Sequence, residues 1–215
     1  MTDFMGNKRH VRSLTVPCIL MVFIMVVLSG CASKNTPLPP QLEELLSKAE
    51  HIDEISYDVT FELGGQTTTV KLWLKKPMIK AESSISNGIT VVRLADMEKQ
   101  RGYRYYPDTK LSVVDNEDIP VPGKADTEAL GKFNPSIIGT GTIDGKTCTI
   151  VMYEDGEATV KLWLWDDYGL LIKSEVTVQD SEEVVVTTIT NIDFSAIPDS
   201  VFTLPEDAVG DYWDN

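Results

Sequence analysis

From residue 55 onward, hydrophobic and polar residues alternate with a period of two over most of the chain. In the first such segment Ile55, Tyr57 and Val59 alternate with polar side chains up to the turn Gly64-Gly65, a pattern typical of strands with one buried face. The connections that follow are short, so consecutive strands are expected to be antiparallel neighbours. The predicted strands are 55–63, 66–75, 78–82, 89–95, 102–106, 110–115, 140–143, 146–153, 157–165, 170–179 and 184–194.

A segment with helical periodicity precedes the predicted strands. Between residues 40 and 51, Leu42, Leu45, Leu46 and Ala49 recur at i, i+3, i+4 and i+7, which predicts a helix with one apolar stripe. A second, short helix is expected at 126–132. Strands greatly outnumber helices, so the fold class is mainly β (α+β): one large curved antiparallel sheet with one or two helices packed on it.

The hexapeptide Thr-Val-Lys-Leu-Trp-Leu occurs twice, beginning at Thr69 and at Thr159, a separation of 90 residues. That distance is too long for a solenoid repeat. Two interpretations stay open. The copies mark two halves of one sheet with similar meanders, or they are a coincidence of residues that favour strands.

Each copy places its aliphatic residues on one face of a strand and its tryptophan on the other. We expect Trp73 and Trp163 to be covered by loops or by the membrane side. The aliphatic face either lines a hydrophobic ligand cavity or is ordinary core. Its residues are the candidate ligand-binding set: Val70, Leu72, Leu74, Val160, Leu162 and Leu164.

The N-terminal 30 residues have another pattern. Lys8, Arg9 and Arg12 precede an uncharged stretch of 15 residues, 14–28, which is shorter than the roughly 20 residues needed to span a bilayer. The pattern predicts a cleaved secretory signal peptide, and the alternative is an uncleaved transmembrane helix. The tetrad Leu28-Ser-Gly-Cys31 resembles the lipobox of prokaryotic lipoproteins. That resemblance implies cleavage before Cys31 and lipid attachment to its thiol.

The predicted organisation is a signal peptide at 1–30, a flexible tether at 31–40, a single domain at 41–209 and an acidic C-terminal tail at 210–215. The lipobox places the mature protein at the cell membrane. It would be lipid-anchored and face the extracytoplasmic side, either the periplasm or the cell exterior.

The net charge of the chain limits which classes of partner are expected. The chain has 19 basic and 33 acidic residues, and removing three basic and one acidic residue with the signal peptide leaves a net charge near −16. Such a protein repels phosphate backbones, so no nucleic-acid partner is expected. Membrane attachment would therefore come from the lipid rather than from a basic patch.

The mature chain holds few residues suited to catalysis or metal binding. His51 is its single histidine, and Cys148 is its single cysteine besides Cys31. A catalytic dyad would need His51, which we instead expect to stand at a helix end. Cys148 is expected to be a buried small hydrophobe. No enzyme activity, no metal site and no cofactor is predicted.

Several phrases resemble the outer-membrane lipoprotein carrier (LolA/LolB-like) superfamily. They are the Lys-Lys-Pro-Met-Ile-Lys-Ala-Glu segment at 75–82, Tyr-Arg-Tyr-Tyr-Pro-Asp-Thr-Lys at 103–110, Trp-Leu-Trp-Asp-Asp-Tyr-Gly-Leu-Leu-Ile-Lys-Ser-Glu at 163–175 and the closing segments 188–194 and 197–205. Leu171 stands where that family usually has proline. The resemblance covers residues 41–205. It implies an incomplete barrel with helices in its concavity and a hydrophobic cavity that receives acyl chains.

The resulting hypothesis is a membrane-anchored exported lipoprotein that is expected to be a monomer. It would bind acyl chains of a lipid or lipoprotein in a half-barrel cavity and have a carrier or sorting role. The alternative is a surface interaction or envelope-sensor lipoprotein with a filled, non-binding core.

Overall fold

The computed structural model divides the chain into two units, Met1–Ser33 and Lys34–Asn215. It describes residues 37–84, 88–115, 127–181 and 183–210, all in the second unit. The predicted signal peptide, Cys31, most of the tether and the tail after residue 210 lie outside these ranges. Among the described residues, no helix has both the length and the apolar character to cross a membrane.

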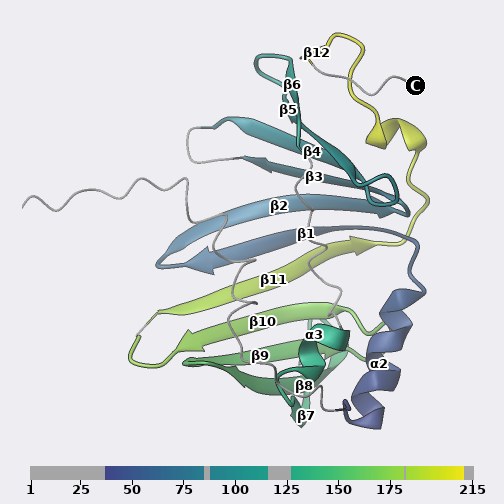
Figure 1. Ribbon diagram of the computed structural model, residues 1–215. Coiled ribbons are helices and arrows are strands. Elements are labelled where there is room, and N and C mark those ends of the chain that lie inside the picture. Colours follow the sequence, from purple (N-terminus) through teal and green to yellow (C-terminus); the bar gives the residue numbers. More distant parts are fainter. Residues whose placement is uncertain (1–36, 85–87, 116–126, 182, 211–215) are drawn as a thin grey trace, which may run out of the picture. The chain divides into compact units, whose positions relative to one another are not determined.

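The described strands form one open sheet (Figure 1). Its order is β12-β6-β5-β4-β3-β2-β1-β11-β10-β9-β8-β7, and the end strands β7 and β12 do not pair with each other. Neighbours are antiparallel except for the parallel pair β12 and β6. The predicted class, a large antiparallel sheet forming an incomplete barrel, is confirmed. The strands are β1 (Glu54–Leu63), β2 (Gln66–Lys75), β3 (Met78–Ser84), β4 (Thr90–Asp96), β5 (Arg101–Tyr106), β6 (Leu111–Val114), β7 (Ser136–Ile143), β8 (Lys146–Asp155), β9 (Ala158–Trp165), β10 (Leu171–Val178), β11 (Val184–Asp193) and β12 (Val209–Gly210).

Two features of the sheet differ from the prediction. Strand β7 begins at Ser136 rather than at residue 140, because a register shift between Ile137 and Gly139 interrupts its alternation and glycine weakens the strand pattern. Residues 199–210 add a 3-10 helix, η2 (Asp199–Phe202), and the two-residue strand β12. Neither element is long enough to show a period in the sequence.

The two halves of the sheet meet where β1 pairs with β11. Val59 lies opposite Ile189, 130 positions later in the chain. Every other antiparallel pair joins strands that follow each other along the chain. This pairing is therefore the seam between the meander β1–β6 and the meander β7–β11.

The repeated hexapeptide occupies equivalent places in the two meanders. Trp73 of β2 lies opposite Lys80 of β3, and Trp163 of β9 lies opposite Lys173 of β10. Strands β2 and β9 are four places apart in the sheet, and an even number of antiparallel steps makes them run in the same direction. The two hairpins are thus related by a shift along the sheet. Of the two interpretations left open by the sequence, similar halves of one sheet is the correct one.

The predicted helices are present as α2 (Pro40–Glu50) and α3 (Thr127–Gly131). Pro40 stands in the first turn of α2, and the apolar stripe Leu42, Leu45, Leu46 and Ala49 is buried as predicted. In Figure 1, α2 lies at the ends of the strands where β1 begins and where the β9–β10 turn is found. We call the sheet face that α2 contacts the inner face and the opposite one the outer face.

The turn between β9 and β10 fits closely against α2. Gly169 has φ +66°, and a Cβ atom built on it would lie 2.1 Å from the carbonyl oxygen of Leu45. In the same region Lys48 Nζ donates a hydrogen bond of 2.6 Å to the Asp166 carbonyl. Only glycine satisfies both the backbone angle and the close approach. This contact fixes α2 at one end of the inner face.

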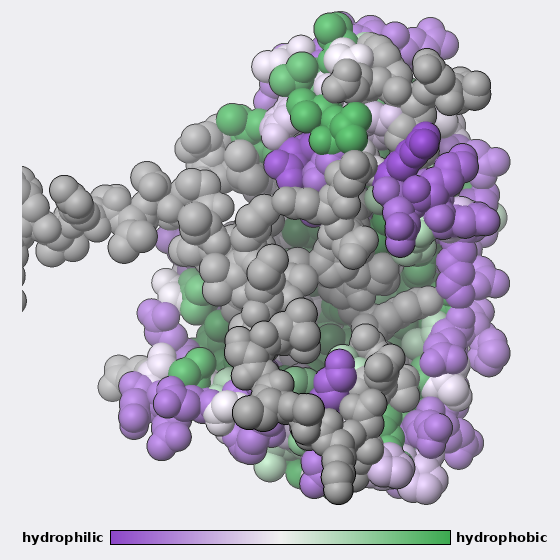
Figure 2. All heavy atoms as spheres, viewed as in Figure 1, coloured by the Kyte–Doolittle hydropathy of each residue, from purple (hydrophilic) through white to green (hydrophobic). Residues whose placement is uncertain are grey.

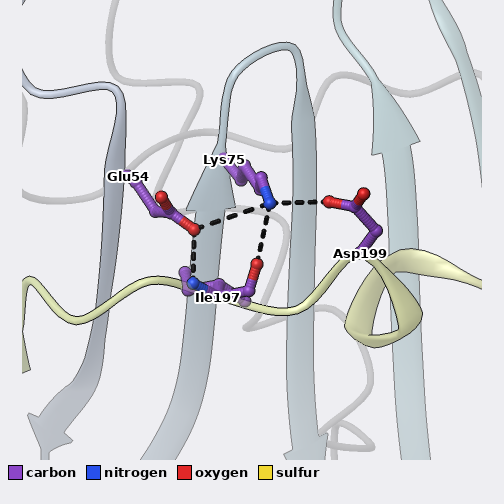
Figure 3. A network of polar contacts seen from close by, with 4 residues as sticks. All are labelled: Glu54, Lys75, Ile197 and Asp199. Carbon is purple, nitrogen blue, oxygen red and sulfur yellow. Dashed lines mark hydrogen bonds and ion pairs between the residues drawn. The ribbon is translucent and has the colours of Figure 1, made fainter.

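A polar network attaches the C-terminal segment to the start of β1 and the end of β2 (Figure 3). Lys75 Nζ donates to the Ile197 carbonyl at 2.9 Å and pairs with Asp199 Oδ1 at 2.6 Å. The Ile197 amide in turn donates to the Glu54 carboxylate, which lies 3.8 Å from Lys75 Nζ. Beyond this network, Leu204 and Ala208 cover Val92, Leu94 and Tyr105. The C-terminal segment therefore buries part of the outer face.

Candidate functional site

The inner face from β8 to β2 carries most of the buried apolar side chains of the sheet, and α2 covers one part of it. Leu42 and Leu46 of the helix are 0% and 1% exposed and belong to one apolar cluster with Val151, Leu164 and Leu130 of α3. Ala49, one turn further along α2, belongs to a second cluster on β1 and β2. Both halves of the sheet thus contribute an apolar cluster to the inner face.

The six predicted ligand-binding residues all lie on this inner face. Five of them are buried, and Val70 is half-buried. Leu72 and Leu74 belong to the cluster that includes Ala49, while Val160, Leu162 and Leu164 belong to the cluster around Leu42. The structure brings both sets to the same helix. Their role in contacting a ligand stays a prediction.

Beyond α2, toward the β1–β2 and β10–β11 turns, the inner face is less completely covered. Phe61, Val70, Val176 and Val185 are half-buried there. They lie on four adjacent strands: Val176 lies opposite Val185, and Val70 lies opposite the core residue Val59. We call these four residues the open wall. Figure 2 shows this face hollowed, with hydrophobic atoms visible inside the hollow.

The tryptophans lie on the outer face, as the alternation predicted, but lysines cover them. Lys71 Nζ and Lys80 Nζ lie 5.1 and 4.6 Å from the centre of the Trp73 ring. The same arrangement surrounds Trp163, with Lys161 Nζ at 4.7 Å and Lys173 Nζ at 4.9 Å. Lysine stems shield apolar surface while the ammonium stays hydrated and contacts the ring face. The expected cover by loops or membrane is thus not needed for these rings.

One charged group on the inner face was missed by the sequence analysis. Arg93 of β4 lies opposite Arg104 of β5, and Asp115 Oδ2 accepts from Arg93 Nε at 3.1 Å and from Arg104 Nη2 at 2.9 Å. Spacing could not reveal this group, because the three residues come from two hairpins whose register is set by the turns.

The residues considered for catalysis are not assembled with one another. His51 is exposed at the C-terminal end of α2. Cys148 is fully buried on the outer side beside Trp163 and Ile172, and burial raises the pKa of its thiol. Within the described ranges, no three His, Cys, Asp or Glu side chains are grouped so as to hold a metal ion. Cys148 is a buried small hydrophobe, as predicted.

No family model matches the chain, and no curated protein matches it by sequence. Comparison with solved structures gives matches at low sequence identity. An uncharacterised conserved protein from Thermus thermophilus has a TM-score of 0.56 at 10% identity, covering 77% of this chain and 95% of that one. The two proteins therefore share a fold.

Two further matches carry names. LprF from Mycobacterium bovis has a TM-score of 0.47 at 15% identity, and the match covers 80% of this chain and 100% of that one. The LolA superfamily protein NE2245 from Nitrosomonas europaea has a TM-score of 0.38 at 12% identity, over 75% of this chain and 97% of that one.

Proposed function

We propose that this protein is an exported lipoprotein, anchored in the membrane through an acylated Cys31, that binds acyl chains of a lipid or lipoprotein on the inner face of its open sheet. A carrier or sorting role would follow from such binding. The observation that supports the proposal most directly is the open wall, a continuous set of half-buried aliphatic and aromatic side chains beyond α2.

The energetics suit a ligand with long hydrocarbon chains. Each methylene that moves from water onto an apolar surface contributes about 0.8 kcal/mol. The open wall spans four adjacent strands, β2, β1, β11 and β10, which corresponds to about 14 Å across the sheet at about 4.8 Å per strand. A surface of that width accommodates a long chain without any hydrogen-bonding partner. No covalent step is involved.

A second function is favoured by a different observation. Leu42 and Leu46 fill part of the inner face, and five of the six predicted ligand-binding residues are at most 8% exposed. A protein whose inner face is filled by its own helix would instead act as a surface interaction or envelope-sensor lipoprotein.

The two functions are separated by titrating the purified protein with a fatty acid that carries a fluorescent group. Val185→Asp places a charge on the open wall, whereas Val184→Asp, the matched control, places it on the outer face of the same strand, where Val184 is 41% exposed. We expect Val185→Asp to weaken binding at least tenfold and Val184→Asp to change it less than twofold. Absence of binding to the wild-type protein, or equal binding by both variants, would favour the filled-core alternative.

A further inference from the structure

Three aromatic side chains from different parts of the chain meet at the end of the sheet where α2 lies. Trp165 is the last residue of β9, Tyr168 stands in the β9–β10 turn, and Phe194 directly follows β11. The centre of the Tyr168 ring lies 4.4 Å from that of Trp165 and 4.5 Å from that of Phe194. We call these three residues the aromatic patch.

The topology of the sheet assembles the aromatic patch. Strand β10 pairs in antiparallel orientation with both β9 and β11, so β9 and β11 run in the same direction and end at the same edge. The Gly169 amide donates a hydrogen bond of 2.7 Å to the Trp165 carbonyl, which closes the turn and holds Tyr168 beside Phe194. The rings are therefore positioned by strand pairing and a tight turn.

The aromatic patch is accessible to solvent. Among the exposed large hydrophobic side chains of the described ranges, Tyr168 at 36% and Phe194 at 38% are the two aromatic ones, and they stack on each other. Trp165 beside them is half-buried. Contiguous exposed apolar groups on a soluble domain are typical of an interaction surface.

Polar groups of both signs border the rings. Trp165 Nε1 donates to Asp167 Oδ2 at 3.2 Å, and Lys146 Nζ lies 5.3 Å from the centre of the Trp165 ring. The Lys48 ammonium is bound to the Asp166 carbonyl in the same turn. Aromatic rings with a polar border are typical of surfaces at the boundary between membrane and water. Cations and carboxylates together also match a zwitterionic headgroup layer, although the whole chain has a net charge of −14.

The aromatic patch belongs to the part of the domain from which the tether leads to Cys31. The β9–β10 turn contacts α2 at Leu45, and Pro40, five residues earlier, is about 7.5 Å away along the helix axis. Nine positions separate Cys31 from Pro40, and nine extended residues span at most about 32 Å. A lipid on Cys31 would thus keep this part of the domain near the bilayer.

We propose that the aromatic patch docks on the membrane–water interface of a zwitterionic phospholipid bilayer and so fixes the orientation of the anchored domain. This inference rests on the lipid anchor of the proposed function. The open wall lies toward the β10–β11 turn, at the opposite end of the strands. In the docked orientation it faces away from the bilayer, accessible to a ligand that arrives from the aqueous side.

The test uses the full-length protein purified from membranes and reconstituted into phosphatidylcholine vesicles. Bromine atoms on the acyl chains quench tryptophan emission on close contact, so emission is compared between vesicles with and without brominated chains. The variants are Trp165→Phe and, as the matched control, Trp73→Phe. Trp73 is also a half-buried tryptophan on the outer face, but it lies in the other meander.

We expect the brominated chains to quench the wild type and Trp73→Phe to the same extent, and Trp165→Phe to lose roughly half or more of this quenching. A second pair of variants leaves Trp165 in place. Tyr168→Ser/Phe194→Ser should also lose roughly half of the quenching, because the remaining ring no longer holds the surface at the bilayer. Val113→Ser/Val114→Ser removes side chains of similar exposure, 43% and 44%, from β6 and should leave the quenching unchanged.

Vesicle flotation separates this inference from the proposed function. A protein that floats with the vesicles but shows equal quenching in all variants overturns membrane docking and leaves the anchor intact. A wild-type protein that does not float overturns the anchor, and membrane docking with it. Cross-linking of two copies through Tyr168 without any quenching would identify a second copy as the occupant of the aromatic patch, which likewise overturns membrane docking.

Discussion

Trp73 and Trp163 lie at equivalent positions of two hairpins four strands apart, and each ring is contacted by two lysine amines. In both hairpins the lysine on the partner strand also pairs with a glutamate two residues later, Lys80 with Glu82 at 3.5 Å and Lys173 with Glu175 at 2.7 Å. The resemblance of the halves therefore extends beyond the hexapeptide to its side-chain contacts.

The two tryptophans differ in burial, so replacing each with alanine is predicted to lower the free energy of unfolding by a different amount. Trp163 is 9% exposed and packs with Cys148 and Ile172, so Trp163→Ala should lower the free energy of unfolding by about 3–5 kcal/mol. Trp73 is half-buried, and Trp73→Ala should cost about 1–2 kcal/mol. Urea unfolding measures both. Equal losses would show that the lysine cover, rather than the packing beneath it, determines the contribution.

Gly169 is predicted to be intolerant of any side chain. Its Cβ would lie 2.1 Å from the Leu45 carbonyl oxygen, so Gly169→Ala should displace α2 and lower the free energy of unfolding by more than about 3 kcal/mol. Gly156 is the matched control, because its φ of +62° is similar and nothing lies within 4 Å of its Cβ. Gly156→Ala should cost about 1–2 kcal/mol, the ordinary cost of a left-handed residue. Similar losses in the two variants would contradict a tight helix contact.

Anchoring is predicted to depend on one of the two N-terminal cysteines. Cys31→Ser should move the protein out of the membrane fraction and remove the acyl mass, whereas Cys18→Ser should leave both unchanged. Membrane fractionation and intact mass of the detergent-extracted protein measure these effects. A wild-type protein that keeps residues 1–30 and carries no acyl mass would support the uncleaved helix instead.

Tyr153 is predicted to make stability fall at alkaline pH. Burial, together with the negative charge of Asp155, raises the pKa of Tyr153 from 10.0 to about 12. Above pH 10 the unfolded chain releases this proton while the folded protein retains it, so stability is full below pH 10 and falls between pH 10 and 12. The loss amounts to about 2.7 kcal/mol, from 1.36 kcal/mol per pKa unit.

Tyr153→Phe should remove that part of the pH dependence. The variant should lose about 2 kcal/mol less than the wild type between pH 9.5 and 11.5 in urea unfolding. Some slope should remain, because burial also raises the pKa of Tyr57. Superimposable pH profiles for variant and wild type would rule out the buried phenol as the cause.

Local pattern was sufficient to predict most of the sheet. The strand pairs joined by short turns have their register determined by those turns, and the stripe beginning at Leu42 identified α2. The pairing of Val59 with Ile189 could not be predicted, because nothing local connects segments so far apart. The same holds for the C-terminal cover that Leu204 and Ala208 provide.

The inner face was harder to identify from sequence than the strands were. Val92 and Leu94 of β4 are buried on the outer face under the C-terminal segment, so hydrophobicity on this strand does not indicate the inner side. In the sequence, Arg93 between them has the position of a solvent-facing residue on an ordinary amphipathic strand. Its position opposite Arg104 follows only once the register of β4 and β5 is known.

The seam between β1 and β11 has a consequence for the order of folding. Ladders within each meander join neighbours in sequence and close short loops, whereas the seam closes a loop of 130 positions at Val59 and Ile189, and long loops are slow to close. As the chain is synthesised, β1 has to wait for almost the entire domain before its second partner exists. Until then its free edge and the apolar side chains beside it are unprotected, so a nascent chain paused before β11 is the form most exposed to aggregation.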